Sequence, residues 1–277
     1  SELRFLPRLQ VLSVRNVQVQ NLAALRGNNV LELVYLSNCG LNDADAQSLF
    51  TMTNIRELNI EGNAITSLEG IQALTRMDCL TIASTQITDL TPLRDLPIGI
   101  LSIVSTPVSS LAGLDNCTFS ENLWTLFAGQ MKVYDLSALH DFPKLEGMYL
   151  EYQYDEAELV HWEQLSGLPL KSMEISFTPV PDWSFLRGMQ SLEKLTIFGA
   201  YVYGREDVMT NLDQLTNLEE LNLSYNGITT LKDFPLDSLT SLKYLDLSGN
   251  CLYDWQFNVF NSRPGLTVKH DDQNPGA

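Results

Sequence analysis

The stretch Leu218-Glu219-Glu220-Leu221-Asn222-Leu223-Ser224-Tyr225-Asn226-Gly227-Ile228 decides the fold. Its leucines follow one another at intervals of three and two, and an asparagine stands three residues after the last leucine. Close copies are LKYLDLSGNCL from Leu242 and IRELNIEGNAI from Ile55. The skeleton recurs eleven times at intervals of 21 to 26 residues, which predicts a solenoid of stacked repeats. The repeats begin at Leu9, Leu31, Ile55, Met77, Ile98, Leu123, Leu145, Leu170, Leu192, Leu218 and Leu242.

Each repeat can be numbered in slots from its first residue. Slots four and six are apolar and alternate with polar neighbours, a pattern typical of a short β-strand with one buried face. Strands of successive repeats then lie side by side in a parallel sheet, and slots three, five and seven face solvent. In a truncated twelfth repeat, Leu266 and Val268 take slots four and six.

The second half of each repeat carries apolar residues three apart, as in Leu68, Ile71 and Leu74. This spacing favours 3₁₀ turns or extended segments over long helices. Such segments need less width than the strand side, so we expect the stack to curve with its sheet on the concave side. The fold class is therefore an α/β solenoid with a concave parallel sheet and convex 3₁₀, short helical or extended segments.

Two longer repeats are expected to hold a true helical turn. Asp43 or Asp45 would cap a helix over residues 46–50, and Asp155-Glu156 would start a helix through Leu159 and Trp162.

Slot nine is mostly small or polar, and it is asparagine in the three cleanest repeats, at Asn63, Asn226 and Asn250. An amide both donates and accepts, so these side chains can satisfy the buried backbone of the turn that leaves the strand. Threonine and cysteine can do part of this, as at Cys39. Met131 and Ala200 cannot, so their turns need other partners.

With its short repeats, this chain resembles the leucine-rich repeat proteins, and among them the internalin-type subclass. The stretch LNIEGNAITSLEGIQALTRMDCLTIASTQITDLTPLRDL, residues 58–96, shows the resemblance best, which extends over the whole chain. It implies a curved solenoid that binds partners, usually proteins, on its concave sheet, without catalysis, in a bacterial secreted or cell-surface protein. The chain starts in the middle of a repeat, at Leu3 and Leu6, so we expect an amino-terminal cap to be missing.

Composition narrows the choice of partner. The 277 residues are 44% apolar and no linker interrupts the repeats, so we expect a single domain over residues 1–277. Seventeen basic residues against 34 acidic ones give a net charge of −17, which argues against nucleic acid or an anionic membrane and is compatible with a basic partner. No apolar run is long enough to span a bilayer, so we expect no membrane insertion. We also expect a monomer.

Catalytic and metal-binding patterns are nearly absent from the sequence. The three histidines, His140, His161 and His270, are not expected to meet, and the four cysteines have no metal-ligand spacing. Phosphate loops, nucleophile elbows and dinucleotide motifs are missing. We therefore expect neither an enzyme nor a cofactor or metal site.

The residues that the repeat leaves free point to a binding surface. Aromatic side chains in slots five, seven and eight gather in five consecutive repeats, together with two glutamates and two flanking rings. Neighbouring strands lie about 4.8 Å apart, so side chains of adjacent repeats can touch. The candidate partner-binding residues are Trp124, Phe127, Tyr149, Glu151, Tyr152, Glu174, Phe177, Phe198, Tyr201 and Tyr225.

Four interpretations of this surface remain open. Exposed aromatic clusters commonly mark interaction sites, which favours a protein or peptide partner. Aromatic rings with carboxylates also suit sugars, so a glycan-binding adhesin is the alternative. The chain could also be the substrate-recognition fragment of a larger enzyme. In the plainest interpretation, the rings only pair across strands.

Overall fold

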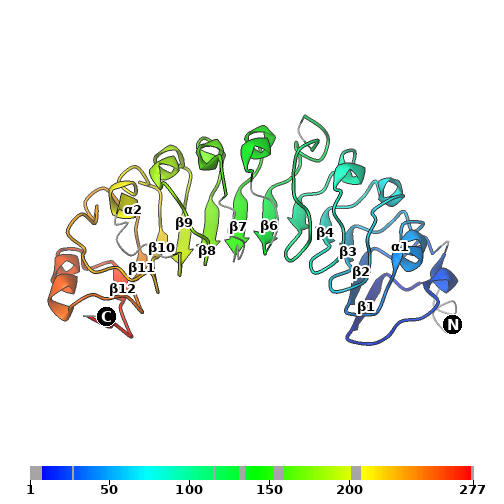
Figure 1. The fold of residues 1–277 in the computed structure, drawn as a ribbon, viewed down its shortest axis with the longest axis horizontal. Coiled ribbons are helices and arrows are strands. Elements are labelled where there is room, and N and C mark those ends of the chain that lie inside the picture. Colours follow the sequence, from blue (N-terminus) through cyan, green and yellow to red (C-terminus); the bar gives the residue numbers. More distant parts are fainter. Residues whose placement is uncertain are drawn as a thin grey trace. The chain divides into compact units, whose positions relative to one another are not determined.

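The computed structural model describes residues 8–26, 28–114, 116–130, 135–151, 159–200 and 207–275. Its contacts divide the chain into an amino-terminal part, residues 1–145, and a carboxyl-terminal part, residues 146–277. The two parts are described in turn. Within each part the strands line the concave side of the stacked repeats, and the helical and 3₁₀ segments line the other side (Figure 1).

The amino-terminal part holds six parallel strands that pair in chain order. They are β1 (Val11–Arg15), β2 (Leu33–Ser37), β3 (Glu57–Asn59), β4 (Cys79–Thr81), β5 (Ile100–Ser102) and β6 (Thr125–Gly129). Outside these strands, the described residues of this part form one α-helix and four 3₁₀ turns. These are α1 (Asp43–Leu49), η2 (Leu22–Leu25), η3 (Ile71–Ala73), η4 (Thr91–Leu93) and η5 (Ser137–Asp141).

The carboxyl-terminal part repeats this arrangement. Its strands are β7 (Gly147–Glu151), β8 (Ser172–Ser176), β9 (Lys194–Phe198), β10 (Glu220–Asn222), β11 (Tyr244–Asp246) and β12 (Thr267–Lys269), again parallel and in chain order. Its other segments are η6 (Trp162–Leu165), η7 (Ser184–Gly188), α2 (Asp207–Thr210) and η8 (Asp254–Ser262).

The predicted slots agree with the observed register. Slot four pairs with slot four, as in Leu58 with Leu80 and Leu221 with Leu245. All four side chains are at most 1% exposed, and so is the slot-six residue Leu223. The apolar residues spaced three apart in the outer half, such as Leu68, Ile71 and Leu74, are buried as well, because they close the repeat over the same core. The fold class is thereby confirmed, and so is the slot assignment of these repeats.

The slot-nine asparagines form the predicted ladder of buried amides. The Asn250 carboxamide oxygen accepts hydrogen bonds from the backbone N–H groups of Asn226 and Ile228, at 3.0 Å each. Its amide nitrogen donates to the carbonyl oxygens of Leu223 and Leu247, at 2.9 and 2.8 Å. Asn226 in turn accepts from the N–H of Ala200. Each asparagine therefore holds the turn of the preceding repeat.

Two expectations about the helical turns need correction. Helix α1 is capped by Asn42, whose side chain accepts from the N–H groups of Ala44 and Asp45, while the Asp45 carboxylate accepts from the Asn42 N–H. Asp45 therefore belongs to a capping box and is not the cap itself. In the second case, residues 152–158 lie outside the described part, and Trp162 opens the 3₁₀ turn η6 behind the left-handed residue His161.

The register of the last repeat is also different from the prediction. Val268 pairs with Leu245, so it occupies slot four and not slot six. His270 therefore takes slot six, where earlier repeats place an apolar residue, and its ring stacks on Phe257 at a centroid distance of 4.2 Å. Val268 is the one apolar residue of β12. The spacing of apolar residues therefore could not tell slot four from slot six in this repeat.

Candidate interaction surface

The solvent side of the carboxyl-terminal sheet brings most of the candidate residues together. Slot-five residues are neighbours across β7 to β9, where Tyr149 lies beside Glu174 and Glu174 beside Thr196. Slot-seven residues are aligned in the same way, with Glu151, Ser176 and Phe198 in one row. Tyr149, Glu174 and Phe198 are half-buried and Glu151 is exposed.

Three rings form a continuous group where strands β8, β9 and β10 end. The rings of Phe177 and Phe198 meet edge to face, with centroids 5.0 Å apart and planes at 85°. Phe198 also contacts Tyr225, with centroids 5.3 Å apart and planes at 56°. Tyr225 remains 51% exposed. We call Phe177, Phe198 and Tyr225 the aromatic row.

The backbone that carries the aromatic row is unusual. Slot eight has a positive φ in the repeats described here, and it holds small or amide residues such as Asn38, Gly62 and Ser84. Phe177 and Tyr225 adopt the same left-handed conformation, with φ of 51° and 59°. Bulky residues rarely do so, because the left-handed region costs roughly 1–2 kcal/mol for a residue with a Cβ.

A shallow polar hollow of about 190 Å³ lies on the same sheet face, across β7 to β11. Tyr149 and Glu174 line it, and the Tyr149 hydroxyl lies 3.5 Å from Ser172 Oγ. Lys194 crosses the hollow to Glu220 at 2.8 Å, and the hydrogen bond to Glu220 raises the pKa of Lys194. The hollow therefore contains both signs of charge.

Lysines on this side of the carboxyl-terminal part are already neutralised by acidic neighbours. The ion pairs are Lys171–Glu146 at 2.9 Å, Lys194–Glu220 at 2.8 Å, Lys243–Glu219 at 2.7 Å and Lys269–Asp246 at 3.3 Å. The one contact described for the Glu174 carboxylate is a hydrogen bond from the hydroxyl of Ser176, on the same strand, at 2.8 Å. Glu174 and the exposed Glu151 thus leave the surface with an excess of negative charge.

Slot five also has a structural role that the sequence analysis missed. The Asn222 carboxamide oxygen accepts from the Ser224 N–H at 2.9 Å, and an Asp246 carboxylate oxygen accepts from the Ser248 N–H at the same distance. Asn59 makes the same bond to Glu61. These are Asx turns that close the end of the strand, and the signal available in the sequence was an Asn or Asp in the slot.

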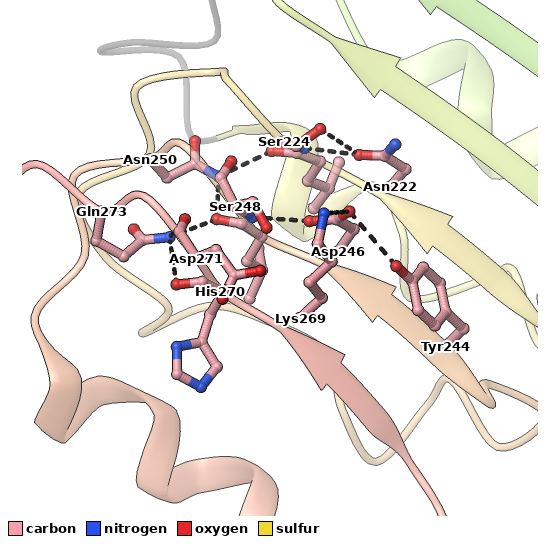
Figure 2. A network of polar contacts seen from close by, with 12 residues as sticks. Asn222, Ser224, Tyr244, Asp246, Ser248, Asn250, Lys269, His270, Asp271 and Gln273 are labelled. Atoms are coloured by element: carbon pink, nitrogen blue, oxygen red, sulfur yellow. Dashed lines mark hydrogen bonds and ion pairs between the residues drawn. The ribbon is translucent and has the colours of Figure 1, made fainter.

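Asp246 makes polar contacts beyond its Asx turn. Figure 2 shows it between Tyr244, Ser248 and Lys269. Burial acts to raise the pKa of Asp246, but the hydrogen bonds from Ser248 and the ammonium of Lys269 outweigh it, so the pKa lies below its ordinary value. The residue is only 7% exposed, and the slot-seven residue Ser248 is 2% exposed. The expectation that slots five and seven always face solvent is therefore wrong for this repeat, and for slot seven it is also wrong at Ser37, Ser176 and Ser224, which are buried.

Of the remaining candidates, two belong to the amino-terminal part and two lie outside the described residues. Phe127 and Trp124 belong to the amino-terminal part, where Phe127 is half-buried in β6. Trp124 precedes that strand and is 43% exposed, with its ring beside Gly99. It thus stands at the amino end of its strand, whereas the aromatic row stands at the carboxyl ends. Tyr152 and Tyr201 lie outside the described residues.

The three histidines have separate surroundings. His140 contacts Asp141 at 3.0 Å, His161 contacts Glu163 at 3.0 Å, and His270 stacks on Phe257. The hydrogen bond from His161 lowers the pKa of Glu163. Across the described ranges, no three metal-ligating side chains come together. In the same ranges, no helix has both the length and the apolar character needed to cross a membrane.

Known proteins resemble this chain in the sequence of its repeats and in its fold. A family description of leucine-rich repeats, in two copies, matches residues 216–258. A leucine-rich repeat-containing G-protein coupled receptor 5A of Xenopus laevis is 35% identical over 106 residues, which is 38% of this chain and 11% of the receptor. The corresponding receptor 5 of Bos taurus is 36% identical over 100 residues, 36% of this chain and 10% of that receptor. The chain thus spans about a tenth of these relatives.

Two solved structures resemble nearly the whole chain. An internalin (InlF) of Listeria monocytogenes superposes with a TM-score of 0.66 at 20% identity, over 97% of this chain and 84% of that one. A leucine-rich repeat protein of Leptospira interrogans superposes with a TM-score of 0.68 at 16% identity, over 96% and 68% of the two chains. At such identities the likeness concerns the fold alone. Together with the repeats and the parallel strands, it shows that this chain folds as a leucine-rich repeat solenoid of the internalin-like kind.

Proposed function

We propose that this protein is a non-catalytic recognition module that binds a protein partner on the sheet face of its carboxyl-terminal part. The contact surface consists of the aromatic row with Tyr149, Glu151 and Glu174. Leucine-rich repeat domains typically bind proteins, which supports the general class of function. The particular surface is proposed from its own chemistry.

The observation that carries the proposal is the left-handed backbone of Phe177 and Tyr225. Most other repeats described here use asparagine, serine or glycine in slot eight, which is less costly in this conformation, and one uses Gln130. Phenylalanine and tyrosine there cost stability and expose apolar surface. Strained residues that a fold retains cluster at functional sites, so a binding role accounts for both costs.

Charge points to a basic partner. The lysines of this face are paired, while Glu151 and Glu174 have no cationic neighbour among their described contacts. The net charge of −17 would accelerate the approach of a cationic surface. We therefore expect arginine or lysine near the apolar anchor of the partner, and an affinity that weakens with salt.

The geometry of the rings favours protein over sugar. A sugar ring stacks best on one flat exposed face, but the rings of the aromatic row are inclined at 85° and 56° to one another. Such a group presents edges as well as faces and suits a branched or aromatic side chain. A glycan ligand is kept as an outcome of the test.

The test uses substitutions that the same slot already tolerates. The double variant Phe177→Ser/Tyr225→Asn installs residue types found in slot eight of other repeats, so its backbone should fold unchanged. Wild type and variant are screened on protein and glycan arrays, and hits are measured by biolayer interferometry at two salt concentrations. The control is Thr81→Ala/Ser102→Ala on the sheet face of the amino-terminal part.

The proposal expects a basic protein whose affinity falls at least about tenfold in the double variant, or about 1.4 kcal/mol or more, and stays constant in the control. A partner that binds wild type and double variant alike would refute the aromatic row as its site. Binding to glycans only would refute the protein class.

A further inference from the structure

A second apolar surface lies away from the sheet, on η8 of the carboxyl-terminal part (Figure 1). Three large apolar side chains are exposed within seven residues: Tyr253 at 51%, Trp255 at 68% and Val259 at 43%. They stand beside a hollow of about 450 Å³, which is larger than the hollow on the sheet face. The hollow is lined mainly by apolar surface of Leu231, Trp255 and Val259, with Thr230, Lys232 and Gln256 around it.

The hollow is held open by contacts beneath it. The Gln256 side chain donates to the Thr229 carbonyl oxygen at 3.1 Å and accepts from the Tyr253 N–H at 2.8 Å, so it ties η8 to the preceding repeat. Phe260, on the inner side of η8, packs edge to face on Phe234 with centroids 5.5 Å apart. These contacts fix η8 and leave Trp255 and Val259 pointing outward. A ligand would find the site formed in advance.

Charge defines the occupant further. Among the described residues that line the hollow, Lys232 is the one that carries a charge. Within the described residues its ammonium has no ion pair, in contrast to Lys171, Lys194, Lys243 and Lys269. An apolar hollow beside an unpaired ammonium complements an apolar side chain that is followed by a carboxylate.

We propose that this hollow, which we call the Trp255 site, binds a segment of a partner protein that carries a large aliphatic side chain next to an Asp or Glu. The aliphatic group packs between Trp255, Val259 and Leu231, and the carboxylate meets Lys232. A second copy of this chain is the less favourable occupant, because two chains that each carry a net charge of −17 repel one another. The Trp255 site and the aromatic row share no residue, so each stands without the other.

The experiment uses the whole chain labelled with 5-fluorotryptophan. Trp255→Phe identifies the ¹⁹F resonance of Trp255 among those of Trp124, Trp162 and Trp183. Three capped tetrapeptides are then titrated: Glu-Leu-Leu-Glu, the charge-reversed Lys-Leu-Leu-Lys and the apolar-deleted Glu-Ser-Ser-Glu. Lys232→Glu tests the ammonium, and Arg187→Glu makes the same charge change on η7 of the same part.

We expect Glu-Leu-Leu-Glu to shift the Trp255 resonance in a saturable way and the other two peptides to bind at least about fivefold more weakly. Lys232→Glu should remove this preference, and Arg187→Glu should keep it. Equal binding of the acidic and basic leucine peptides, or no saturable shift with any peptide, would overturn the proposal. A saturable shift with methyl β-glucoside alone, or a dimer that Trp255→Ser abolishes, would also overturn it, in favour of a sugar or a second copy.

Discussion

The ring of Phe177 lies against Gly199 so closely that a Cβ at position 199 would sit 2.8 Å from its Cδ1 atom. Tyr225 has the same relationship with Gly249, where the distance would be 2.5 Å. In both pairs a bulky residue in slot eight covers a glycine in slot eight of the next repeat, and both glycines have positive φ. Phe177 and Tyr225 can therefore occupy their places in the aromatic row because residues 199 and 249 are glycines.

The first prediction concerns the variant Gly199→Ala. The new methyl group would clash with the Phe177 ring, and the alanine would have to adopt a φ of +57°. We therefore expect the free energy of unfolding to fall by roughly 1–3 kcal/mol. The ring should also move, which changes the near-ultraviolet circular dichroism. Urea unfolding measures the first effect. Gly265→Ala is the control, because a Cβ there has no atom within 4 Å. Equal stability of both variants would contradict the close contact.

The second prediction uses two residues of the same slot. Asn250 is fully buried and bonds two backbone N–H groups and three carbonyl groups. The Thr106 hydroxyl, by contrast, donates to the Ile103 carbonyl oxygen, at 2.7 Å. Leaving a buried backbone group without a partner costs about 1–3 kcal/mol. Asn250→Ala should thus cost at least about 3 kcal/mol and Thr106→Ala about 1 kcal/mol in denaturant unfolding. Comparable losses in the two variants would show that water replaces the amide.

Much of the fold could be predicted from the sequence because burial in a repeat is periodic. Leu221 and Leu223 stand two apart in a strand whose inner face has no other occupant, and every copy of the pattern strengthens the same assignment. The cap of α1 could not be chosen, because Asn42, Asp43 and Asp45 are all capping residue types and only the backbone conformation separates them. The last repeat was out of register because His270 replaces its slot-six leucine.

The candidate surface was less predictable than the fold. The alternation of a strand tells which side a residue faces, and it brought Tyr149, Glu174 and Phe198 to one face of the carboxyl-terminal part. The alternation does not tell which of these side chains accept hydrogen bonds from the backbone, so it does not predict the Asx turn of Asp246. The exposure of Trp255 was missed as well, because apolar residues in the outer half of a repeat are usually core.

The third prediction is a pH dependence at Asp246. Its pKa in the folded protein lies below the ordinary value of about 3.9, because the hydrogen bonds from Ser248 and the charge of Lys269 outweigh burial. A depressed carboxylate pKa stabilises the fold above the pKa of the unfolded chain, and this contribution is lost as the pH falls through the folded pKa. Asp246→Asn keeps an acceptor for Ser248 but cannot ionise.

We therefore expect Asp246→Asn to be less stable than wild type by about 0.5–1 kcal/mol near neutral pH, and the difference to shrink as the pH falls below about 4. Urea unfolding over this pH range measures it. The control is Asp233→Asn, at an exposed carboxylate, which should stay within about 0.5 kcal/mol of wild type near neutral pH. A difference at Asp246 that does not change with pH would assign its effect to packing and not to charge.

The fourth prediction compares side chains on the buried and the solvent side of the strands, taken from three repeats. Leu223 is fully buried, so Leu223→Ala should cost roughly 2–5 kcal/mol in urea unfolding. Thr81→Ala, half-buried on the solvent side of β4, should stay within about 0.5 kcal/mol. Asn59→Ala should fall between them, at about 1 kcal/mol, because its oxygen accepts from Ser37 Oγ at 3.1 Å and from the Glu61 N–H at 2.9 Å. If Asn59→Ala behaved like Thr81→Ala, the Asx turn of Asn59 would contribute nothing measurable to stability.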